Sequence, residues 1–532
     1  MLRISNLKLN INEEKSSLEE KIIKKLKIRK DEIIEYSIYK ESIDARKNDI
    51  NFIYTIDVKL RNEKKILSNK KIKDVKESLK YEYEDVKAGN ENLENRPVIV
   101  GFGPAGLFCA LMLSYRGYKP IVLEQGEDVD NRSKTVEKFL KEGKLNEYSN
   151  VQFGEGGAGT FSDGKLTSRS KDKRVLKVLQ EFVKGNAPKE ILYKAKPHIG
   201  TDILKNVVKN IRKTIIDNGG QIIFNSKVKD FKIEDNKIKG VYYNDEFIKT
   251  NTVVLATGHS CRDIYKKLYE RNFELIQKPF AIGLRIEHPQ ILINKSQYKE
   301  YFDNKNLSSA EYHLTYKTKD EKRSVYTFCM CPGGVVINST SSKERLVVNG
   351  MSEHKRDKEN ANSALLVNIK PSDFSSTNPL SGIDFQEEFE KKAFVLGGSN
   401  YNVPVQRVKD FINGVKSEKI GSIKPTVTPD YTLTNLKECL PDFVYEALKE
   451  GIINLDTKLK GFALEDAILT GVETRSSSPI RIKRSAESLE STNIKNFYPC
   501  GEGAGYSGGI ISSAIDGIKI AEKIISKYKP ID

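Results

Sequence analysis

The spacing of apolar residues divides the first 90 residues into short strands and helices. Where apolar and polar residues alternate we expect strands, and where apolar residues recur every three or four positions we expect helices. The expected elements are strands over residues 1–11, 33–42 and 48–60 and helices over residues 16–28 and 68–84. This order predicts a ferredoxin-like α+β domain over residues 1–90, and the polar residues 87–96 read as a linker.

The next stretch, PVIVGFGPAGLFCALMLSYRGYKPIVLEQG, has a different pattern. An apolar strand over residues 98–100 leads into a glycine-rich turn, and a helix follows from about residue 105 to residue 116. A second apolar strand over residues 120–123 ends in an acidic residue. A strand, a glycine turn, a helix, a second strand and an acid in this order predict a dinucleotide-binding unit.

Each glycine of this motif has a mechanical role. Gly101 permits the tight turn, Gly103 lets backbone N–H groups reach a pyrophosphate, and Gly106 lets the helix pack on the strand. Glu124 can accept hydrogen bonds from ribose hydroxyls.

The chain returns to the nucleotide twice more, and this favours FAD over NAD. TNTVVLATG (residues 250–258) is a buried strand that ends in Ala-Thr-Gly, and NFYPCGEGAGYSGGI (residues 496–510) is a strand followed by a glycine loop and a helix. A nucleotide-binding loop followed by a helix brings backbone N–H groups and a favourable dipole to a phosphate or a reduced flavin. We therefore expect the tail to close an FAD site. GEGGAG at residues 154–159 lacks a strand–helix frame, so we expect no built-in NAD(P)H domain.

Composition narrows the class of protein further. The chain has 532 residues, of which 38% are hydrophobic, which indicates a globular protein of two or three domains. Glycines interrupt the longest apolar region, and the N-terminus lacks the apolar core of a signal peptide. We expect a cytoplasmic protein without a membrane span. Six cysteines without a CxxC pair, and histidines without HxxxH spacing, predict neither a disulfide scaffold nor a metal site.

The net charge of +16 makes nucleic acid a partner to consider. The lysines are spread along the whole chain and form no basic arm. A solvated, lysine-rich surface is the preferred interpretation, although the charge leaves nucleic acid open as an alternative.

Several stretches together resemble a known family. They include RPVIVGFGPAGLF, SNVQFGEGGAGTFSDGKL, LATGHSCRD, FAIGLRIEHPQ, YTFCMCPGG, GVETRSSSPIRI and CGEGAGYSGGI. Over nearly its whole length the chain resembles the uncharacterised FAD-dependent dehydrogenases of bacteria and plastids. The resemblance implies FAD and oxidoreductase chemistry, but it supplies no substrate.

The resemblance also implies an α/β architecture. A doubly wound FAD-binding domain of the two-dinucleotide-fold type would carry the N-terminal domain and an inserted α+β substrate domain. The expected boundaries are residues 1–90 for the accessory domain, 96–275 for the first part of the FAD-binding domain, 276–475 for the inserted domain and 476–532 for the return to the FAD-binding domain.

These motifs supply the candidate cofactor-binding residues. Lys165, which ends a glycine-rich loop, could stabilise negative charge at flavin N1, and Arg132 could contact an FAD phosphate or ribose. Glu502 stands where many relatives have an aspartate that binds the ribityl chain. The candidates are Gly101, Gly103, Pro104, Ala105, Gly106, Glu124, Gln125, Arg132, Gly157, Lys165, Val228, Thr257, Gly258, Gly501, Glu502, Gly508, Gly509 and Ile510.

Three residues are candidates for catalysis. His259 follows the Ala-Thr-Gly turn and could act as a general acid, and His288 could face the flavin from the inserted domain. Arg475 could hold an anionic substrate, because guanidinium binds carboxylate bidentately, and an ordinary structural ion pair is the alternative. Cys329 and Cys331 could be a redox pair, but burial as small apolar side chains is the preferred interpretation.

Three functions remain open at this point. The first is an FAD-dependent oxidoreductase that moves two electrons between FAD and a small substrate, for which an anion is one candidate. It would need an external electron donor or acceptor, with NAD(P)H as one candidate. The second is a flavin-dependent tRNA-modifying protein of the glucose-inhibited-division type. The third is a flavoprotein without turnover.

Overall fold

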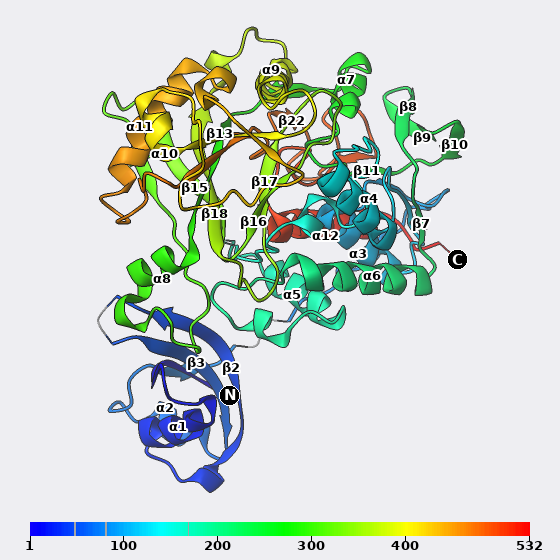
Figure 1. The fold of residues 1–532 in the computed structure, drawn as a ribbon. Coiled ribbons are helices and arrows are strands. Elements are labelled where there is room, and N and C mark those ends of the chain that lie inside the picture. Colours follow the sequence, from blue (N-terminus) through cyan, green and yellow to red (C-terminus); the bar gives the residue numbers. More distant parts are fainter. Residues whose placement is uncertain (47–48, 80–81, 169, 532) are drawn as a thin grey trace.

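The N-terminal part of the chain forms a small unit at one end of the molecule (Figure 1). The computed structural model describes residues 1–46, 49–79, 82–168 and 170–531. The unit consists of β1 (Leu2–Asn10), α1 (Leu18–Leu26), β2 (Ile33–Asp44), β3 (Asn51–Leu60), α2 (Glu63–Leu67) and β4 (Val75–Glu77). Its sheet has the antiparallel order β2-β3-β1-β4, and α1 covers one face through Leu18, Ile22 and Leu26.

The second helix of this unit differs from the expectation. We expected it over residues 68–84, whereas α2 ends at Leu67 and β4 lies within the expected range; residues 80 and 81 lie outside the described residues. The Asn62 side chain caps α2 by accepting a hydrogen bond from the Lys65 N–H at 3.2 Å. β4 then pairs with the edge of β1 that β3 leaves open. This pairing satisfies backbone groups of residues that the periodicity alone had assigned to a helix.

The segment before the first glycine motif is not a free linker. The Tyr83 hydroxyl donates to Glu522 at 2.9 Å, and the Gly89 N–H donates to the carbonyl of Ile525 at 2.8 Å. A Cβ at Gly89 would lie 2.3 Å from the Lys527 carbonyl. The expected linker therefore runs against the C-terminal helix.

The main body is built on a five-stranded parallel sheet. Its order is β23 (Phe497–Pro499), β11 (Val253–Leu255), β5 (Val98–Val100), β6 (Ile121–Leu123) and β7 (Gln221–Ile223). The strand that precedes the tail thus pairs beside the two strands that frame the first glycine motif. The strands are short, and apart from the edge strand β7, which begins with the exposed Gln221, they are buried apolar runs, as expected for a sheet covered on both faces.

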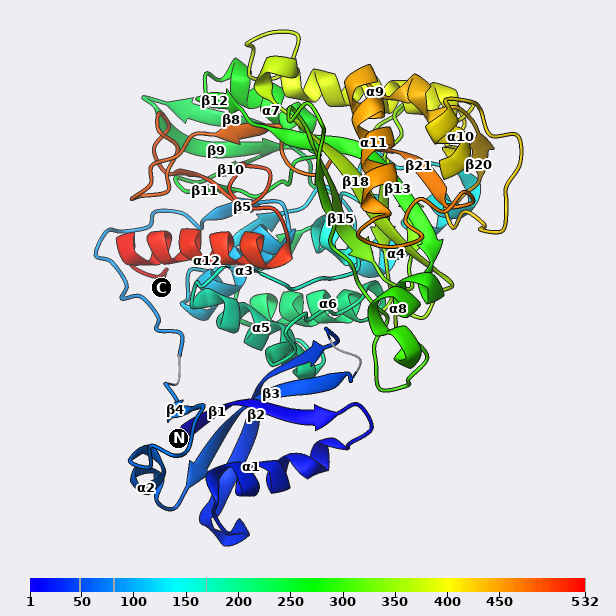
Figure 2. The same cartoon turned by 90° about the vertical axis from the view of Figure 1, so that its left-hand side faces the viewer.

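Helices cover one face of this sheet. They are α3 (Pro104–Tyr115), α5 (Arg174–Lys184), α6 (Thr201–Asp217) and α12 (Ile510–Lys527). The remaining helix, α4 (Val129–Glu142), packs through Val136 against Val151, Phe161 and Ile337. Figures 1 and 2 show α12 lying alongside α3. The opposite face packs against an antiparallel sheet of β8 (Val228–Glu234), β9 (Lys237–Tyr243) and β10 (Glu246–Lys249) and against α7 (Arg262–Glu270). This small sheet stands where a doubly wound domain would carry helices, so the fold is mixed α/β.

The inserted region forms a seven-stranded, largely antiparallel sheet. Its order is β14 (Thr315–Lys317), β15 (Ser324–Cys331), β18 (Asn360–Ile369), β13 (Phe280–Pro289), β21 (Ile468–Glu473), β19 (Val403–Arg407) and β20 (Tyr431–Leu433). Among the elements around it are α8 (Gln290–Tyr298), α9 (Ser381–Leu396), α10 (Val408–Asn413), α11 (Asp442–Leu455) and the hairpin of β16 (Val335–Asn338) and β17 (Val348–Met351). Two short strands, β12 (Leu275–Gln277) and β22 (Ile480–Ile482), form an antiparallel pair where the chain passes between the main body and the inserted region.

Within the described part of the chain, no helix is long and apolar enough to cross a membrane.

Candidate functional site

A cavity of about 420 Å³ lies between the parallel sheet and the inserted sheet. Its wall begins at the first glycine motif, passes the glycine-rich loop of residues 152–168 and the turn after β11, and ends at β15, β17 and the end of β21. The tail forms another part of the wall through residues 508–513. Segments that are far apart in the sequence therefore share one site.

The first glycine motif has a tight turn at Gly101 and close packing at Gly106, as the sequence predicted. Gly101 has φ +98°, and a Cβ there would lie 2.5 Å from the Ala256 carbonyl oxygen. A Cβ at Gly106 would lie 2.0 Å from the Gly101 carbonyl oxygen, so this glycine lets α3 pack on β5 and does not line the cavity. Gly103 caps α3 and faces the cavity, where the nearest atom to an added Cβ is 3.7 Å away.

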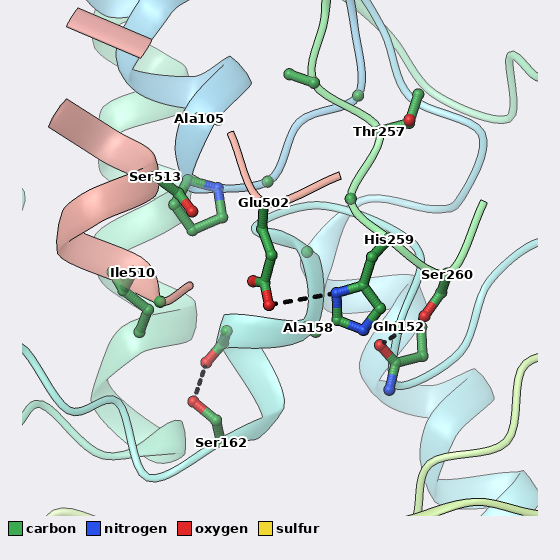
Figure 3. A pocket seen from close by; sticks show the side chains of 18 of the residues that line it. Ala105, Gln152, Ala158, Ser162, Thr257, His259, Ser260, Glu502, Ile510 and Ser513 are labelled. Carbon is green, nitrogen blue, oxygen red and sulfur yellow. Dashed lines mark hydrogen bonds and ion pairs between the residues drawn. The ribbon is translucent and has the colours of Figure 1, made fainter. Parts of the chain in front are cut away.

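The glycines of the tail loop also face open space in the cavity. A Cβ added at Gly508 or Gly509 would meet no protein atom within 4 Å, and the same is true of Gly258. Gly509 is the N-cap of α12, so the N-terminus of α12 and that of α3 both point at the cavity. Figure 3 shows Ala105 of α3 beside Ile510 and Ser513 of α12. Helix N-termini favour anions. The absence of protein atoms around these three glycines indicates space for a ligand.

Gly501 does not line this cavity, contrary to the expectation. It has φ +79°, and a Cβ there would lie 2.7 Å from the Cβ of Ala105. Its role is to let the tail loop pass close to α3.

Glu124 organises the loops at the end of the cavity that the first glycine motif forms. Its carboxylate accepts hydrogen bonds from the N–H groups of Phe102 at 2.8 Å and of Gly126 and Gly154 at 3.0 Å. Gln125 and Val228 line the cavity next to it. This donor set, with open glycines and helix N-termini on one side and an acid at the strand end on the other, fits FAD.

The structure corrects the role of Arg132. Its side chain is fully buried and does not line the cavity. Its guanidinium donates to backbone carbonyls at 2.6 to 3.0 Å, and the acceptors are Asn150, Val151, Glu155 and Gly157. Four of its five N–H donors are used in this way, and the guanidinium is buried outside the cavity wall. Arg132 therefore shapes the glycine-rich loop from behind.

Lys165 and Gly157 lie in the cavity wall, as expected. The Lys165 ammonium contacts the carboxylate of Asp163 at 2.6 Å and the carbonyl oxygen of Met330. Burial would lower the pKa of Lys165, but the neighbouring Asp163 carboxylate raises it, so the ammonium stays charged. This cation therefore joins the glycine-rich loop to the inserted sheet.

His259 also lies in the wall, and Figure 3 shows it pointing toward Glu502. Its Nδ1 is 3.3 Å from a Glu502 carboxylate oxygen, and its buried Nε2 has no hydrogen-bond partner among the described residues. Thr257 and Gly258 precede it in the same turn. A histidine held through one nitrogen can accept or donate a proton at the other.

His288 is not part of the site. It lies in β13, fully buried, and its Nε2 is 2.8 Å from the Phe462 carbonyl oxygen. Burial lowers the pKa of His288 to about 4. The alternation along β13 turns this side chain into the core of the inserted domain, so the expectation that it faces the flavin is wrong.

Arg475 reaches the cavity wall, but its guanidinium is already engaged. It donates to the two carboxylate oxygens of Glu390 at 3.0 and 2.8 Å and to the Ser341 hydroxyl at 2.6 Å. Arg262 binds the same carboxylate at 2.7 Å. Burial would raise the pKa of Glu390, but the two guanidinium groups hold it well below its usual range. For Arg475, these contacts therefore favour the structural ion pair over the substrate anchor.

Sequence reasoning assigned no role to Glu473, which is 4% exposed and lines the cavity at the end of β21. One of its oxygens accepts from the buried Arg285 at 2.9 Å. Burial raises the pKa of Glu473 to about 7, although Arg285 opposes the shift. The partner lies 188 residues away in the chain, so no local pattern could have revealed this pair.

Two family models match this chain. One, described as FAD-dependent protein, C-terminal domain-like, matches residues 279–476, and the other, a domain of unknown function (DUF8436), matches residues 1–59. Together with the donor set of the cavity, the first match defines the chain as a flavoprotein. FAD is its cofactor, which confirms the sequence prediction.

A particular relative then fixes the family. An uncharacterized protein of Clostridium beijerinckii (strain ATCC 51743 / NCIMB 8052) is 54% identical over 528 residues, which is 99% of each chain. The chain belongs to the family of that protein.

Solved structures are similar only at a low level. They include glycine oxidase from Bacillus cereus ATCC 14579 (14% identity, 82% of this chain and 98% of that chain, TM-score 0.32) and L-proline dehydrogenase from P. horikoshii (12%, 81% and 93%, TM-score 0.34). Another is CtdE in complex with FAD (10%, 81% and 83%, TM-score 0.32).

Proposed function

We propose that the protein is an FAD-dependent oxidoreductase that transfers two electrons between FAD and a small organic substrate. The observation that carries this proposal is the continuity of the cavity. The glycine loops and two helix N-termini line one end of the cavity. The same cavity extends to the inserted sheet at Phe328, Asn349 and Glu473. One end of the cavity thus suits a dinucleotide, and the other leaves room for a second molecule. FAD supplies the redox chemistry, and the protein positions the substrate and moves protons.

The residues of the dinucleotide end would divide the binding between them. Backbone N–H groups at the start of α3, next to Gly103, would hold the pyrophosphate, and Glu124 would accept from ribose hydroxyls. The start of α12, at Gly509, would stabilise negative charge on the cofactor. Gln125 and Val228 lie at the adenosine side in this arrangement.

His259 is the residue that we propose to move a proton. Glu502 orients the ring through Nδ1, and the buried Nε2 is the ring nitrogen that has no partner among the described residues, which makes it the candidate for proton exchange. Because a carboxylate oxygen accepts hydrogen bonds, the contact with Glu502 favours the tautomer that carries its N–H at Nδ1 and leaves Nε2 as an acceptor. Glu502 therefore acts through His259, in addition to any contact with the cofactor.

We also propose a division of the chain into domains. The strand order of residues 1–79, with two helices between the strands, supports a ferredoxin-like fold for this unit. Every segment of the cavity wall begins after residue 99, so this unit would be an accessory domain. Residues 96–275 and 476–532 would form the FAD-binding domain, and residues 276–475 would form the substrate domain.

A pair of variants on one helix tests the FAD site. Gly509→Leu places a branched side chain in space that no protein atom fills, so it should lower FAD affinity by about tenfold or more without a steric clash inside the protein. Ser526→Leu, on the exposed side of the same helix, is the matched control. FAD content and affinity follow from the flavin absorbance and from equilibrium titration of apoprotein. Equal FAD affinity of the two variants would remove the tail from the proposed site.

An anaerobic screen tests the enzymatic part. NADH, NADPH and a library of metabolites are mixed with the FAD-loaded protein, and bleaching of the flavin absorbance is recorded. We expect at least one small molecule to reduce the flavin, and His259→Gln should slow that reduction while FAD stays bound. A flavin that no donor reduces, despite full FAD loading, would instead support a flavoprotein without turnover.

A further inference from the structure

The end of β15 carries two cysteines in the wall of the cavity. Cys329 and Cys331 both line it, and neither forms a disulfide in this structure. Cys329 is exposed, whereas Cys331 is 1% exposed. Neither thiol is among the residues that we propose to bind FAD.

An irregularity in the sheet brings both cysteines to the cavity. β15 pairs with β18 in regular order up to Phe328 opposite Ala364, and the pairing resumes at Cys331 opposite Asn362. The strand therefore has one residue more than its partner at this point, which is a β-bulge.

This extra residue decides which side chain faces the cavity. Strict alternation would give Phe328 and Met330 the same face. Because of the bulge, Cys331 takes that face, and Met330 packs into the core of the inserted domain at 4% exposure. Cys329 adopts φ +45°, an uncommon conformation for a residue with a side chain. Such a conformation persists where the surrounding structure enforces it, and it is often found at functional sites.

Two cations contact the backbone of this segment. Arg285 donates to the Cys329 carbonyl at 3.0 Å, and its other terminal nitrogen is 3.9 Å from the Cys331 sulfur. The Lys165 ammonium contacts the Met330 carbonyl oxygen. Burial raises the pKa of the Cys331 thiol to about 12, and both cations oppose this shift. Positive charge next to a thiol stabilises the thiolate that attacks a disulfide or forms one.

We propose that Cys329 and Cys331 are a redox-active dithiol that exchanges two electrons with the bound FAD. In the oxidative direction the two S–H bonds break and one S–S bond forms, and the two electrons and two protons convert FAD to FADH₂. The reverse step returns the two thiols and oxidised FAD. Cys329 is the sulfur that an external small thiol or disulfide can reach more easily, since Cys329 is exposed and Cys331 is buried.

This inference rests on the proposed FAD site but goes beyond it. A flavoprotein that used FAD alone would accept about two electrons per FAD, whereas FAD together with a disulfide accepts about four. The difference can be measured without knowledge of the substrate.

The experiment is an anaerobic reductive titration of FAD-loaded protein after oxidation with diamide and desalting. Dithionite is the reductant, and the point at which added dithionite is no longer consumed, seen as its own absorbance, gives the end point. Wild type should consume about four electrons per FAD, while Cys329→Ser and Cys331→Ser should consume about two. Cys439→Ala, which alters a buried cysteine outside the cavity wall, is the control and should match wild type.

Peptide mass spectrometry provides the second measurement. Cleavage after Arg323 and Lys343 releases both cysteines in one peptide. After diamide this peptide should resist alkylation, and after dithionite it should take up two alkyl groups. If Cys331→Ser does not fold, Cys329→Ser alone decides, because that side chain is exposed.

Two results would overturn the proposal. One is full alkylation of the peptide after diamide, and the other is uptake of about two electrons per FAD by oxidised wild type. Either result with full FAD loading rejects the dithiol and leaves the FAD site intact. A protein that binds no FAD would instead reject the proposed function.

Discussion

Gly517 of α12 packs directly on Ala105 of α3: a Cβ on Gly517 would lie 2.1 Å from the Ala105 carbonyl oxygen. The tail helix can therefore approach the helix of the first glycine motif only because residue 517 has no side chain. This contact sets the spacing between the two helix N-termini that face the cavity.

Gly517→Ala should push α12 away from α3. Overpacking of this kind costs about 1–3 kcal/mol in the free energy of unfolding, and FAD affinity should fall as well, because the N-terminus of α12 moves. Chemical denaturation and FAD titration measure the two effects. The exposed Ser526→Ala on the same helix is the control. Unchanged stability of Gly517→Ala would contradict the close packing.

Arg475→Ala should act on stability and leave the FAD site in place. It removes one of the two guanidinium groups that bind the buried Glu390 carboxylate, and breaking a buried ion pair costs roughly 3 kcal/mol or more. The measurement is the free energy of unfolding together with a sulfate titration followed by flavin absorbance. A selective loss of sulfate affinity at normal stability would restore Arg475 as an anion anchor.

Arg132→Met should disorder the glycine-rich loop. The substitution keeps much of the side-chain length but leaves backbone carbonyls of residues 150–157 without donors, at a cost of about 1–3 kcal/mol for each buried acceptor that finds no water. Hydrogen exchange in this loop should rise, and FAD affinity should fall as a consequence. The exposed Lys134→Met is the control. Loss of FAD with unchanged exchange in the loop would indicate a direct contact between Arg132 and the cofactor.

Glu473→Gln should change how stability depends on pH. In the folded protein the pKa of Glu473 is raised from 4.5 to about 7. Between these values the folded state holds a proton that the unfolded state has released, so Glu473 makes the wild type less stable as pH rises through this range. Relative to the variant, wild type should lose on the order of 3 kcal/mol between pH 4.5 and pH 8.

Urea denaturation of both FAD-loaded proteins at several pH values measures this difference. The exposed Glu487→Gln variant should follow wild type throughout. Parallel pH profiles for wild type and Glu473→Gln would mean that the Glu473 carboxyl titrates in its usual range.

The sequence by itself determined the parts of this protein that depend on local spacing. An apolar strand, three glycines at fixed intervals and an acid 23 residues after Gly101 impose a turn that exposes backbone N–H groups. The glycine-rich tail also exposes backbone N–H groups at the start of a helix. The two motifs together predicted FAD as the cofactor. These features need only residues close in sequence, because turn geometry and helix termini are local properties.

Only the tertiary structure decided what the charged and sulfur-containing side chains do. Arg132 and Arg475 looked like ligands of an anion, yet their partners are carbonyls and a carboxylate that the fold brings to them. His288 is turned into a core by the register of its strand, and Cys331 is turned toward the cavity by a bulge of one residue. Such outcomes depend on contacts between distant segments, because burial and hydrogen-bond partners are settled by packing and not by the pattern of the chain.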